Sequence, residues 1–237
     1  MKYLRKFTDA ATANTFLASD DNLSPNVTYV ESNKHVLFDI KPGLFIQHVN
    51  GKLFTLEDWA AQGFAVSDAN GIAVCDANSS FVISKDSLGQ RTWGVSQIVN
   101  NVLTTTNTNT AKADYDGEDH TREIVRQLDG IVDESGITGA PAAKACAAYR
   151  FPNGKPGYLP SYGELMFIYN NMTTINKMLN AIGGTALEWI VGTSTKYIIW
   201  SSTQRSETAA WCVSTSYTTN FYADKNQEGY VRPITKL

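Results

Sequence analysis

The chain of 237 residues has few cysteines and few histidines, and neither type forms a cluster. Its three cysteines, Cys75, Cys146 and Cys212, are far apart and include no CxxC pair, so the spacing of a structural zinc site or a redox disulfide is missing. The three histidines are equally scattered and show no metal-ligand spacing. We therefore expect no cofactor, and we expect the thiols to be buried as small apolar side chains.

The sequence also has no block of charge of one sign and no long apolar run. Twenty basic and 23 acidic side chains give a net charge of -3, which argues against a nucleic-acid or anionic-membrane partner. Asp9 and repeated Thr and Asn interrupt residues 1–21, so these residues do not match a signal peptide, and no other stretch is long enough to span a membrane. We expect no direct membrane insertion and a partner recognised by shape, stacking and hydrogen bonds.

Motifs for catalysis are missing as well. The chain contains no GxSxG, HExxH, P-loop or dinucleotide-binding fingerprint. Its paired carboxylates, such as Glu118 and Asp119, are adjacent in sequence and so point apart, which is typical of a solvated face. We therefore predict that the protein is not an enzyme.

The acidic segment DYDGEDH, residues 114–120, has two readings. Asp114, Asp116 and Asp119 offer hard oxygen ligands for calcium around a glycine. Their spacing is not that of an EF-hand loop, and acidic groups also favour the N-terminus of a helix. We favour a turn that leads into a helix and predict no metal site, and calcium stays open as the alternative.

The elements that are present indicate a mixed α+β protein. At the front, residues 8–18 suit a short helix capped by Thr8, and residues 27–32 and 34–40 alternate as the two strands of a small hairpin. We take residues 1–43 as an N-terminal helix and β-hairpin module. It is too small to bury much surface alone, so we expect it to lean on the rest of the chain or on a neighbouring chain.

Residues 44–237 form the larger predicted domain. Two hairpins come first, at 44–56 around Asn50-Gly51 and at 71–86, and the polar tract 104–112 suggests an exposed loop. The predicted helices are 121–134 capped by Thr121, 141–151, and one or two within 161–184 that end at Gly183-Gly184. Residues 197–203, 209–215 and 228–234 are the last predicted strands.

The segment GYLPSYGEL, residues 157–165, predicts a structural junction. Ser161 is a suitable N-cap, and Glu164 three residues later completes a capping box. Pro160 makes the approach to the helix rigid.

The segment from Trp200 to Ile234 is the strongest candidate for a functional surface. Alternation along AAWCVSTS places Trp211 and Val213 on an inward face and Cys212, Ser214 and Ser216 on an outward face. The outward set continues into Tyr-, Asn- and Asp-rich sequence of the kind that antibody paratopes use. An ordinary solvated loop is the alternative.

Motifs in a fixed order suggest a family. GIAV, FVISKDSLGQRTWG, DYDGEDHTREI, AKACAAYRFPNGKPGYLPSYGEL, IGGTAL, YIIWSSTQ and YVRPI together resemble C-terminal domains with the C-type-lectin-like fold. This family is related to the formylglycine-generating enzymes, and the resemblance covers about residues 44–237. It implies an α+β, C-type-lectin-like domain behind the small N-terminal module.

Members of this family from gut Bacteroides and their phages look like the variable target proteins of diversity-generating retroelements. In these proteins the segment between the WSST-type and VRP-type strands is the mutagenised ligand-binding surface. The resemblance assigns a framework role to Trp200, Ser201, Ser202, Thr203, Trp211, Val213, Tyr230, Val231, Arg232 and Pro233. It assigns the variable, ligand-binding surface to Arg205, Ser206, Thr208, Ala209, Cys212, Ser214, Ser216, Tyr217, Asn220, Tyr222 and Asp224.

The resemblance implies a receptor-binding protein displayed on a phage tail or cell surface. Residues 1–42 are similar to a short module at the front of Bacteroides phage structural proteins, which favours a virion component. The expected partner is a cell-surface protein or glycan, and a homotrimer is the natural arrangement for a fibre tip. The alternative is a structural virion or fimbrial-type module without a ligand site.

Two features of the related families are missing. The calcium-dependent sugar-binding tripeptides EPN, QPD and WND are absent, so metal-bridged glycan binding is not implied. The cysteine pair of the formylglycine-generating enzymes is absent as well, which argues against their oxidase chemistry.

Overall fold

The structure is a computed structural model that describes residues 2–18, 27–29, 35–39, 42–187, 198–214 and 221–237. Its helices are α1 Ala10–Ala18, α2 Leu56–Gln62, α3 Thr108–Lys112, α4 Gly117–Leu128, α5 Pro141–Ala148, α6 Tyr162–Asn170 and α7 Met172–Ala181, with a 3-10 turn η1 at Val66–Asp68. Its strands are β1 Lys2–Lys6, β2 Val27–Tyr29, β3 His35–Asp39, β4 Gly43–His48, β5 Leu53–Phe54, β6 Ala69–Cys75, β7 Ser80–Ile83, β8 Gln90–Thr92, β9 Ile198–Gln204, β10 Ala209–Ser214, β11 Phe221–Asp224, β12 Glu228–Tyr230 and β13 Ile234–Lys236.

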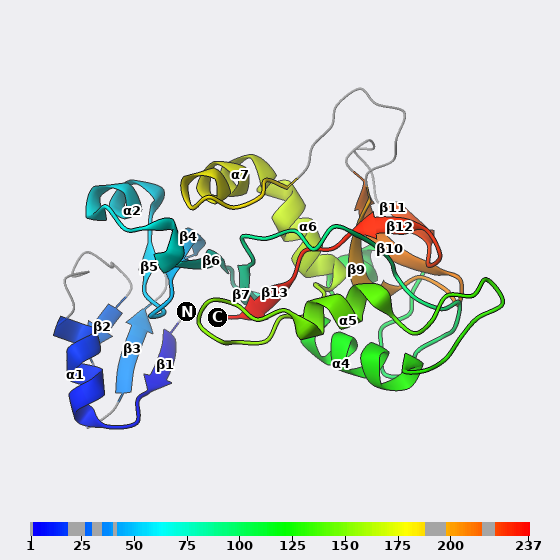
Figure 1. The fold of residues 1–237 in the computed structure, drawn as a ribbon, viewed down its shortest axis with the longest axis horizontal. Coiled ribbons are helices and arrows are strands. Elements are labelled where there is room, and N and C mark those ends of the chain that lie inside the picture. The colour runs from blue at the N-terminus through cyan, green and yellow to red at the C-terminus, as the bar shows by residue number, and fades with distance from the viewer. Residues whose placement is uncertain (1, 19–26, 30–34, 40–41, 188–197, 215–220) are drawn as a thin grey trace.

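The strands form three sheets, which confirms the α+β class. The sheets have the orders β1-β3-β2, β13-β7-β6-β4-β5 and β11-β10-β9-β12-β8. They follow one another along the long axis of the molecule, with the first sheet at one end and the third at the other (Figure 1). The last strand, β13, returns to the middle sheet and pairs with β7.

The N-terminal sheet contains the predicted hairpin and one strand that was not predicted. β2 and β3 pair antiparallel as expected. β1 lies on the other side of β3 and pairs with it antiparallel. The helix α1 is capped by Asp9 rather than by Thr8, because the Asp9 carboxylate accepts a hydrogen bond from the backbone N–H of Thr12 at 2.7 Å.

This first part of the chain packs directly on the middle sheet. Phe7 and Phe16 share one apolar cluster with Leu53 of β5, Val82 of β7 and Phe151. The rings of Phe7 and Phe16 also contact each other, with centroids 5.1 Å apart. The small module therefore does lean on the rest of the chain, as its limited area required.

The two predicted hairpins of the middle sheet are confirmed. β4 pairs with β5 around the Asn50-Gly51 turn, where Gly51 has a φ of +99° that favours glycine. β6 pairs with β7 and also with β4, which makes β6 a central strand with every residue buried. The helix α7 packs on this sheet through an apolar cluster that includes Ile175 and Leu179.

Two local predictions in the helical region were wrong. α4 begins at Gly117, so Thr121 lies inside the helix and its hydroxyl donates to the Gly117 carbonyl at 2.8 Å. The reason is that the acidic residues after Asp116 already favour a helix N-terminus there. The tract 104–112 is not wholly a loop, because Asn107 caps the short helix α3.

The predicted helix end at Gly183-Gly184 is confirmed. Gly183 has a φ of +66°, and its N–H donates to the carbonyl of Asn180 at 3.3 Å. The N–H of Gly184 donates to the carbonyl of Leu179 at 2.8 Å. This pair of bonds is the Schellman arrangement, which satisfies the last carbonyls of α7.

The predicted capping box of α6 is also confirmed, and it lies at the centre of the fold. Ser161 is the N-cap, and the Glu164 carboxylate accepts from the Ser161 backbone N–H at 2.9 Å. Glu164 has no exposed area, accepts from the Tyr158 hydroxyl at 3.0 Å, and lies 3.6 Å from the Lys236 ammonium. Burial raises the pKa of Glu164, and the Ser161, Tyr158 and Lys236 donors oppose this rise.

The start of α4 fits tightly against this cap. A Cβ atom added at Gly117 would collide with Glu164 Oε2 and would lie 2.6 Å from the backbone nitrogen of Ser161. Only a residue without a side chain leaves the cap closed, which explains the glycine within DYDGEDH.

We expect Gly117→Ala to lower the free energy of unfolding by about 1–3 kcal/mol, because the added methyl group must displace the capping box. Chemical denaturation of the full chain measures this change. Glu118→Ala, at the exposed neighbouring position, is the control and should change stability by less than about 0.5 kcal/mol. Equal stability of both variants would contradict the tight fit.

Candidate ligand-binding surface

Strand β10 is an interior strand whose two faces are both covered. On one face Trp211 and Val213 pack with Tyr162 of α6, and the rings of Tyr162 and Trp211 have centroids 5.1 Å apart. On the other face Ala210 and Cys212 belong to the apolar cluster that also holds residues of α4 and α5. The third sheet therefore lies between two layers of helices.

This arrangement corrects part of the predicted surface. Ala209, Cys212 and Ser214 were expected to face solvent, but their relative exposures are 4%, 0% and 1%. For Cys212 and Ser214 the alternation was predicted correctly, and the error was to assign their face to solvent. Ala209 lies on the face of Trp211 and is buried at the start of the strand. A sequence pattern of period two separates two faces, but it does not reveal that helices cover both.

Strand β11 is at the edge of the sheet and carries exposed residues. Its register places Tyr222 opposite Trp211 and Asp224 opposite Ala209. Residues opposite each other in antiparallel strands project on the same face, so Tyr222 and Asp224 share the face of Trp211. Tyr222 is 45% exposed and Asp224 is also exposed.

Arg205 follows β9 and stacks on this edge. Its guanidinium lies 3.6 Å from the centroid of the Tyr222 ring, and the Tyr222 ring meets the Trp211 ring edge-on at 6.1 Å. A cation over an aromatic face is attracted to it. The Arg205 Nε atom is buried and has no hydrogen-bond acceptor among the residues that the structure describes.

The turn between β9 and β10 completes the exposed surface. The backbone N–H of Arg205 donates to the carbonyl of Ala209 at 2.9 Å, and the Ser206 hydroxyl accepts from the Ala209 N–H at 3.1 Å. Thr208 is exposed beside them. We call the following set the Arg205–Tyr222 surface: Arg205, Ser206, Thr208, Tyr222 and Asp224.

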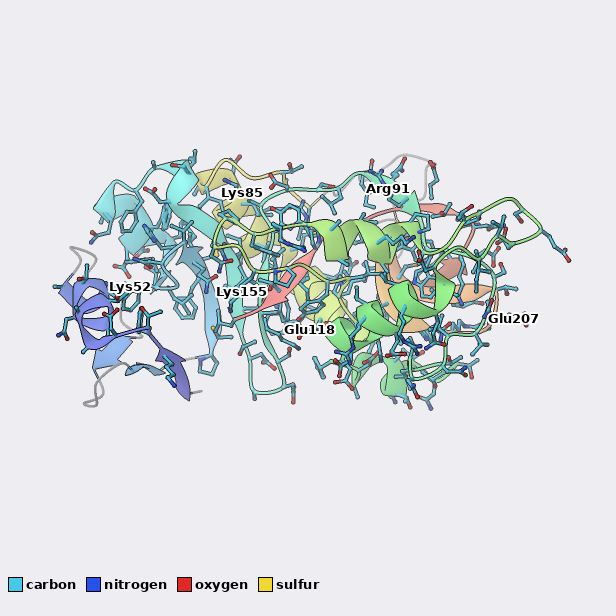
Figure 2. The ribbon with its side chains drawn as sticks, turned by 60° about the horizontal axis from the view of Figure 1, so that its bottom comes forward. Lys52, Lys85, Arg91, Glu118, Lys155 and Glu207 are labelled. Atoms are coloured by element: carbon cyan, nitrogen blue, oxygen red, sulfur yellow. The ribbon has the colours of Figure 1, made fainter. Side chains whose placement is uncertain are left out.

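Figure 2 shows where the turn between β9 and β10 lies, because it labels Glu207. Glu207, in the same turn, lies toward the end of the long axis opposite to Lys52, which is beside the N-terminal module. Three other predicted surface residues, Ser216, Tyr217 and Asn220, are outside the described residues.

Several of the predicted framework residues are held in place by hydrogen bonds. The Ser201 hydroxyl donates to the carbonyl of Trp211 at 2.6 Å, which joins β9 to β10. The indole of Trp200 donates to the carbonyl of Arg91 at 3.0 Å. The guanidinium of Arg232 donates to the carbonyls of Ser84 and Thr185 at 3.1 and 2.8 Å.

Three buried residues have the composition of a catalytic triad but not its geometry. Ser202 and Asp114 both approach the same ring nitrogen of His120, Nδ1, at 3.4 and 3.5 Å. The other nitrogen, Nε2, accepts from the backbone N–H of Leu103 at 3.3 Å. A triad needs the nucleophile and the carboxylate on opposite nitrogens, so this cluster cannot pass a proton from Ser202 to Asp114 through the ring.

The acidic segment also carries no cation cluster. Asp114 points inward and bonds the Thr203 hydroxyl, whereas Asp116 and Asp119 are exposed. Within the described part of the chain no group of three or more His, Cys, Asp or Glu residues could hold a metal ion. Among the same residues no helix is long and apolar enough to cross a membrane.

Burial determines the direction in which the pKa values of the three thiols shift. It raises the pKa of Cys75 to about 12, and it raises the pKa values of Cys146 and Cys212 well above the ordinary 9.0. A thiol becomes a nucleophile as its thiolate, so these cysteines are inert small apolar side chains at neutral pH.

Lys225 stabilises the turn between β9 and β10 from inside the protein, and it was not identified from the sequence. It has no exposed area, and its ammonium donates to the carbonyl of Gln97 at 2.6 Å and to the side chain of Gln204 at 2.9 Å. It also lies 4.3 Å from the centroid of the Trp93 ring. A lysine beside polar loop residues is expected to be solvated, so only the fold reveals its burial.

Burial lowers the pKa of Lys225 from the ordinary 10.5 to about 7, and Glu207 opposes this shift. Below about pH 7 both the folded and the unfolded chain carry the proton, and the full cost of burying the ammonium is present. Between about pH 7 and pH 10.5 the unfolded chain binds more protons than the folded chain at this site. The contribution of Lys225 to stability therefore rises with pH across this window.

We expect the stability of the wild-type chain, relative to Lys225→Met, to increase as the pH is raised from about 6.5 to about 9.5, with a slope of up to about 1.4 kcal/mol per pH unit. Urea unfolding of both proteins over this range measures the difference. Exposed Lys177, replaced by Met in the same way, is the control for the loss of a positive charge. A difference that does not depend on pH would contradict the burial of an ammonium at this position.

Comparisons with known proteins give one informative likeness of fold. No protein-family model matches the chain, and no curated protein matches it. Among solved structures, it is similar to a fimbrial protein from Bacteroides ovatus ATCC 8483, with a TM-score of 0.58 and 13% sequence identity. The match covers 84% of this chain and 49% of that protein, so the chain spans about half the length of its structural neighbour. At this identity the likeness concerns the fold alone.

Proposed function

We propose that the protein is a non-enzymatic binding protein that attaches to a receptor through the Arg205–Tyr222 surface. The observation that carries the proposal is the Arg205 guanidinium, which lies 3.6 Å over the exposed Tyr222 ring and whose Nε has no hydrogen-bond acceptor among the residues that the structure describes. Arg and Tyr are the residue types that most often contribute strongly to binding at protein surfaces. An arginine already held by an aromatic ring loses little freedom when a ligand arrives.

The support of the surface also favours a binding role. Trp211 and Val213 are packed under α6, and Lys225 and Gln204 connect the turn to the loop at residues 97–104. Side chains on the turn and the edge strand can then change without a change in the core, because exposed substitutions usually cost little stability. This property suits a surface whose specificity is adjusted by mutation.

The resemblance described above extends this proposal. It suggests a C-type-lectin-like domain that carries a diversified surface on a phage tail or a cell surface, with a cell-surface protein or glycan as the receptor. A homotrimer would place three copies of the surface side by side, and several weak contacts then give strong attachment. Sedimentation of the purified chain tests the trimer.

A second candidate is a structural subunit of a surface fibre. The observation that favours it is the likeness to the fimbrial protein from Bacteroides ovatus. In that case the purified chain would assemble into rods, which electron microscopy would detect, and the Arg205–Tyr222 surface would bind nothing.

We expect the labelled full chain to bind saturably to intact cells of some strains in a panel of gut Bacteroides. Tyr222→Ala and Arg205→Ala should each weaken this binding by at least about tenfold, the effect of a residue that contributes more than about 1.4 kcal/mol. Flow cytometry across a concentration series measures the apparent affinity.

The matched control is Val132→Ala, because Val132 is 59% exposed and is not part of the Arg205–Tyr222 surface. Its binding should equal that of the wild type. If the Tyr222 and Arg205 variants also bind like the wild type, the receptor contacts another surface. If no strain is bound and the chain forms rods, the structural candidate replaces the binding proposal.

A further inference from the structure

We infer that the Arg205–Tyr222 surface recognises a sugar acid, with the ligand carboxylate paired to the Arg205 guanidinium. This inference rests on the proposed binding function and names the chemical class of the ligand. It follows from the state of Arg205, from the groups around it and from the sign of the nearby charges.

The guanidinium of Arg205 is positioned but not neutralised. The guanidinium stacks on Tyr222, the backbone N–H of Arg205 donates to the carbonyl of Ala209, and the side-chain Nε has no hydrogen-bond acceptor among the described residues. No carboxylate of the described chain comes within 4.0 Å of it, whereas Arg122 and Arg126 on α4 are each paired with an acidic neighbour. Because Nε is buried, the donors that Arg205 keeps for an external partner are the planar fork of paired N–H groups on its two terminal nitrogens.

A carboxylate fits this fork better than other acceptors do. Two parallel N–H groups of a guanidinium match the two oxygens of a carboxylate, and this bidentate pair is stronger than a neutral hydrogen bond. Stacking on Tyr222 fixes the plane of the guanidinium, so the direction of approach is defined in advance. The partial burial of Arg205 reduces the competing hydration of the pair.

The remaining groups match a sugar ring. Ser206 and Thr208 offer hydroxyls, Asp224 offers an acceptor for sugar hydroxyls, and the exposed part of the Tyr222 ring offers an apolar contact. A hexose carries hydroxyls on its edge and C–H groups on its faces, so it can use all of these partners together. An isolated acidic side chain of a protein would use Arg205 alone.

Two acidic residues define the charge that the site tolerates. Glu207 is exposed on the same turn as Arg205, and Asp224 is exposed on the edge strand β11. They repel an anion whose charges lie side by side, such as a polyphosphate, more strongly than a polymer that carries one carboxylate on each sugar or on alternate sugars. A sugar acid avoids this repulsion, because it presents one carboxylate to Arg205 and neutral hydroxyls toward Asp224.

The experiment uses the full chain and immobilised polysaccharides in matched pairs. The acidic members are polygalacturonate, alginate, hyaluronan and polysialate, and the partner of each is its carboxyl-reduced form, which replaces every carboxylate with an alcohol. Biolayer interferometry measures both members. We expect at least one acidic polymer to bind at least about tenfold more tightly than its reduced form.

Variants test the role of Arg205. Arg205→Gln should lose the preference for the acidic polymer, and Arg205→Lys should recover only part of it, because lysine keeps the charge but not the fork. The control Arg126→Gln removes another exposed arginine and should bind like the wild type. Thermal unfolding of each variant verifies that the fold is intact.

Several results would overturn the inference. Equal binding of acidic and reduced polymers would do so, as would an unchanged preference in Arg205→Gln. Stronger Arg205-dependent binding to an Asp- and Glu-rich peptide would show that the carboxylate comes from a protein. Tyr222-dependent binding to cells without binding to any sugar acid would reject this inference and leave the proposed function standing, whereas the absence of cell binding would reject the proposed function itself.

Discussion

A single buried carboxylate, Glu164, joins parts of the chain that are distant in sequence. It closes the capping box of α6, accepts a hydrogen bond from Tyr158, lies within 3.4 Å of the Ser79 hydroxyl on the turn between β6 and β7, and lies 3.6 Å from the ammonium of Lys236 on β13. Burial of a charge is costly unless it is paired and hydrogen-bonded. The middle sheet, α6 and the C-terminal strand must therefore all be in place for this group to be satisfied.

The same junction determines where the third sheet lies. The Ser161 hydroxyl donates to the backbone carbonyl of Asp114, and the Asp114 carboxylate accepts from Thr203 on β9. The Thr203 hydroxyl in turn accepts from the backbone N–H of Tyr162, the first residue of α6. These bonds hold α6 against β9 and β10, and the packing of Tyr162 on Trp211 follows. The exposed edge of the sheet is then carried by a rigid interior.

The packing of helices on the third sheet explains why the Arg205–Tyr222 surface is small. Helices cover both faces of β10, so exposed side chains are found at the turn between β9 and β10 and along the edge strand β11. Arg205 and Tyr222 meet there although 17 positions separate them in the chain. A cation that stacks on an exposed ring at the edge of a sheet can still meet a partner. The ammonium of Lys225, in contrast, is buried and donates its hydrogen bonds to acceptors inside the protein.

The sequence by itself determined the local structure, because capping boxes, hairpin turns and glycine helix ends depend on a few neighbouring residues. Ser161 with Glu164, Asn50-Gly51 and Gly183-Gly184 were all identified in this way. The start of α4, the helix α3 and the strand β1 were missed, because neighbouring signals competed or were weak.

Only the tertiary structure decided which of the candidate surface residues reach solvent. Cys212 and Ser214 are buried because helices pack on both sides of their sheet, and no period in the sequence reports a second covering layer. The register of β11 on β10 brought Tyr222 to the face of Trp211 and under Arg205. Pairing between strands and packing between layers join residues that are far apart in the chain, and for that reason local sequence patterns do not contain them.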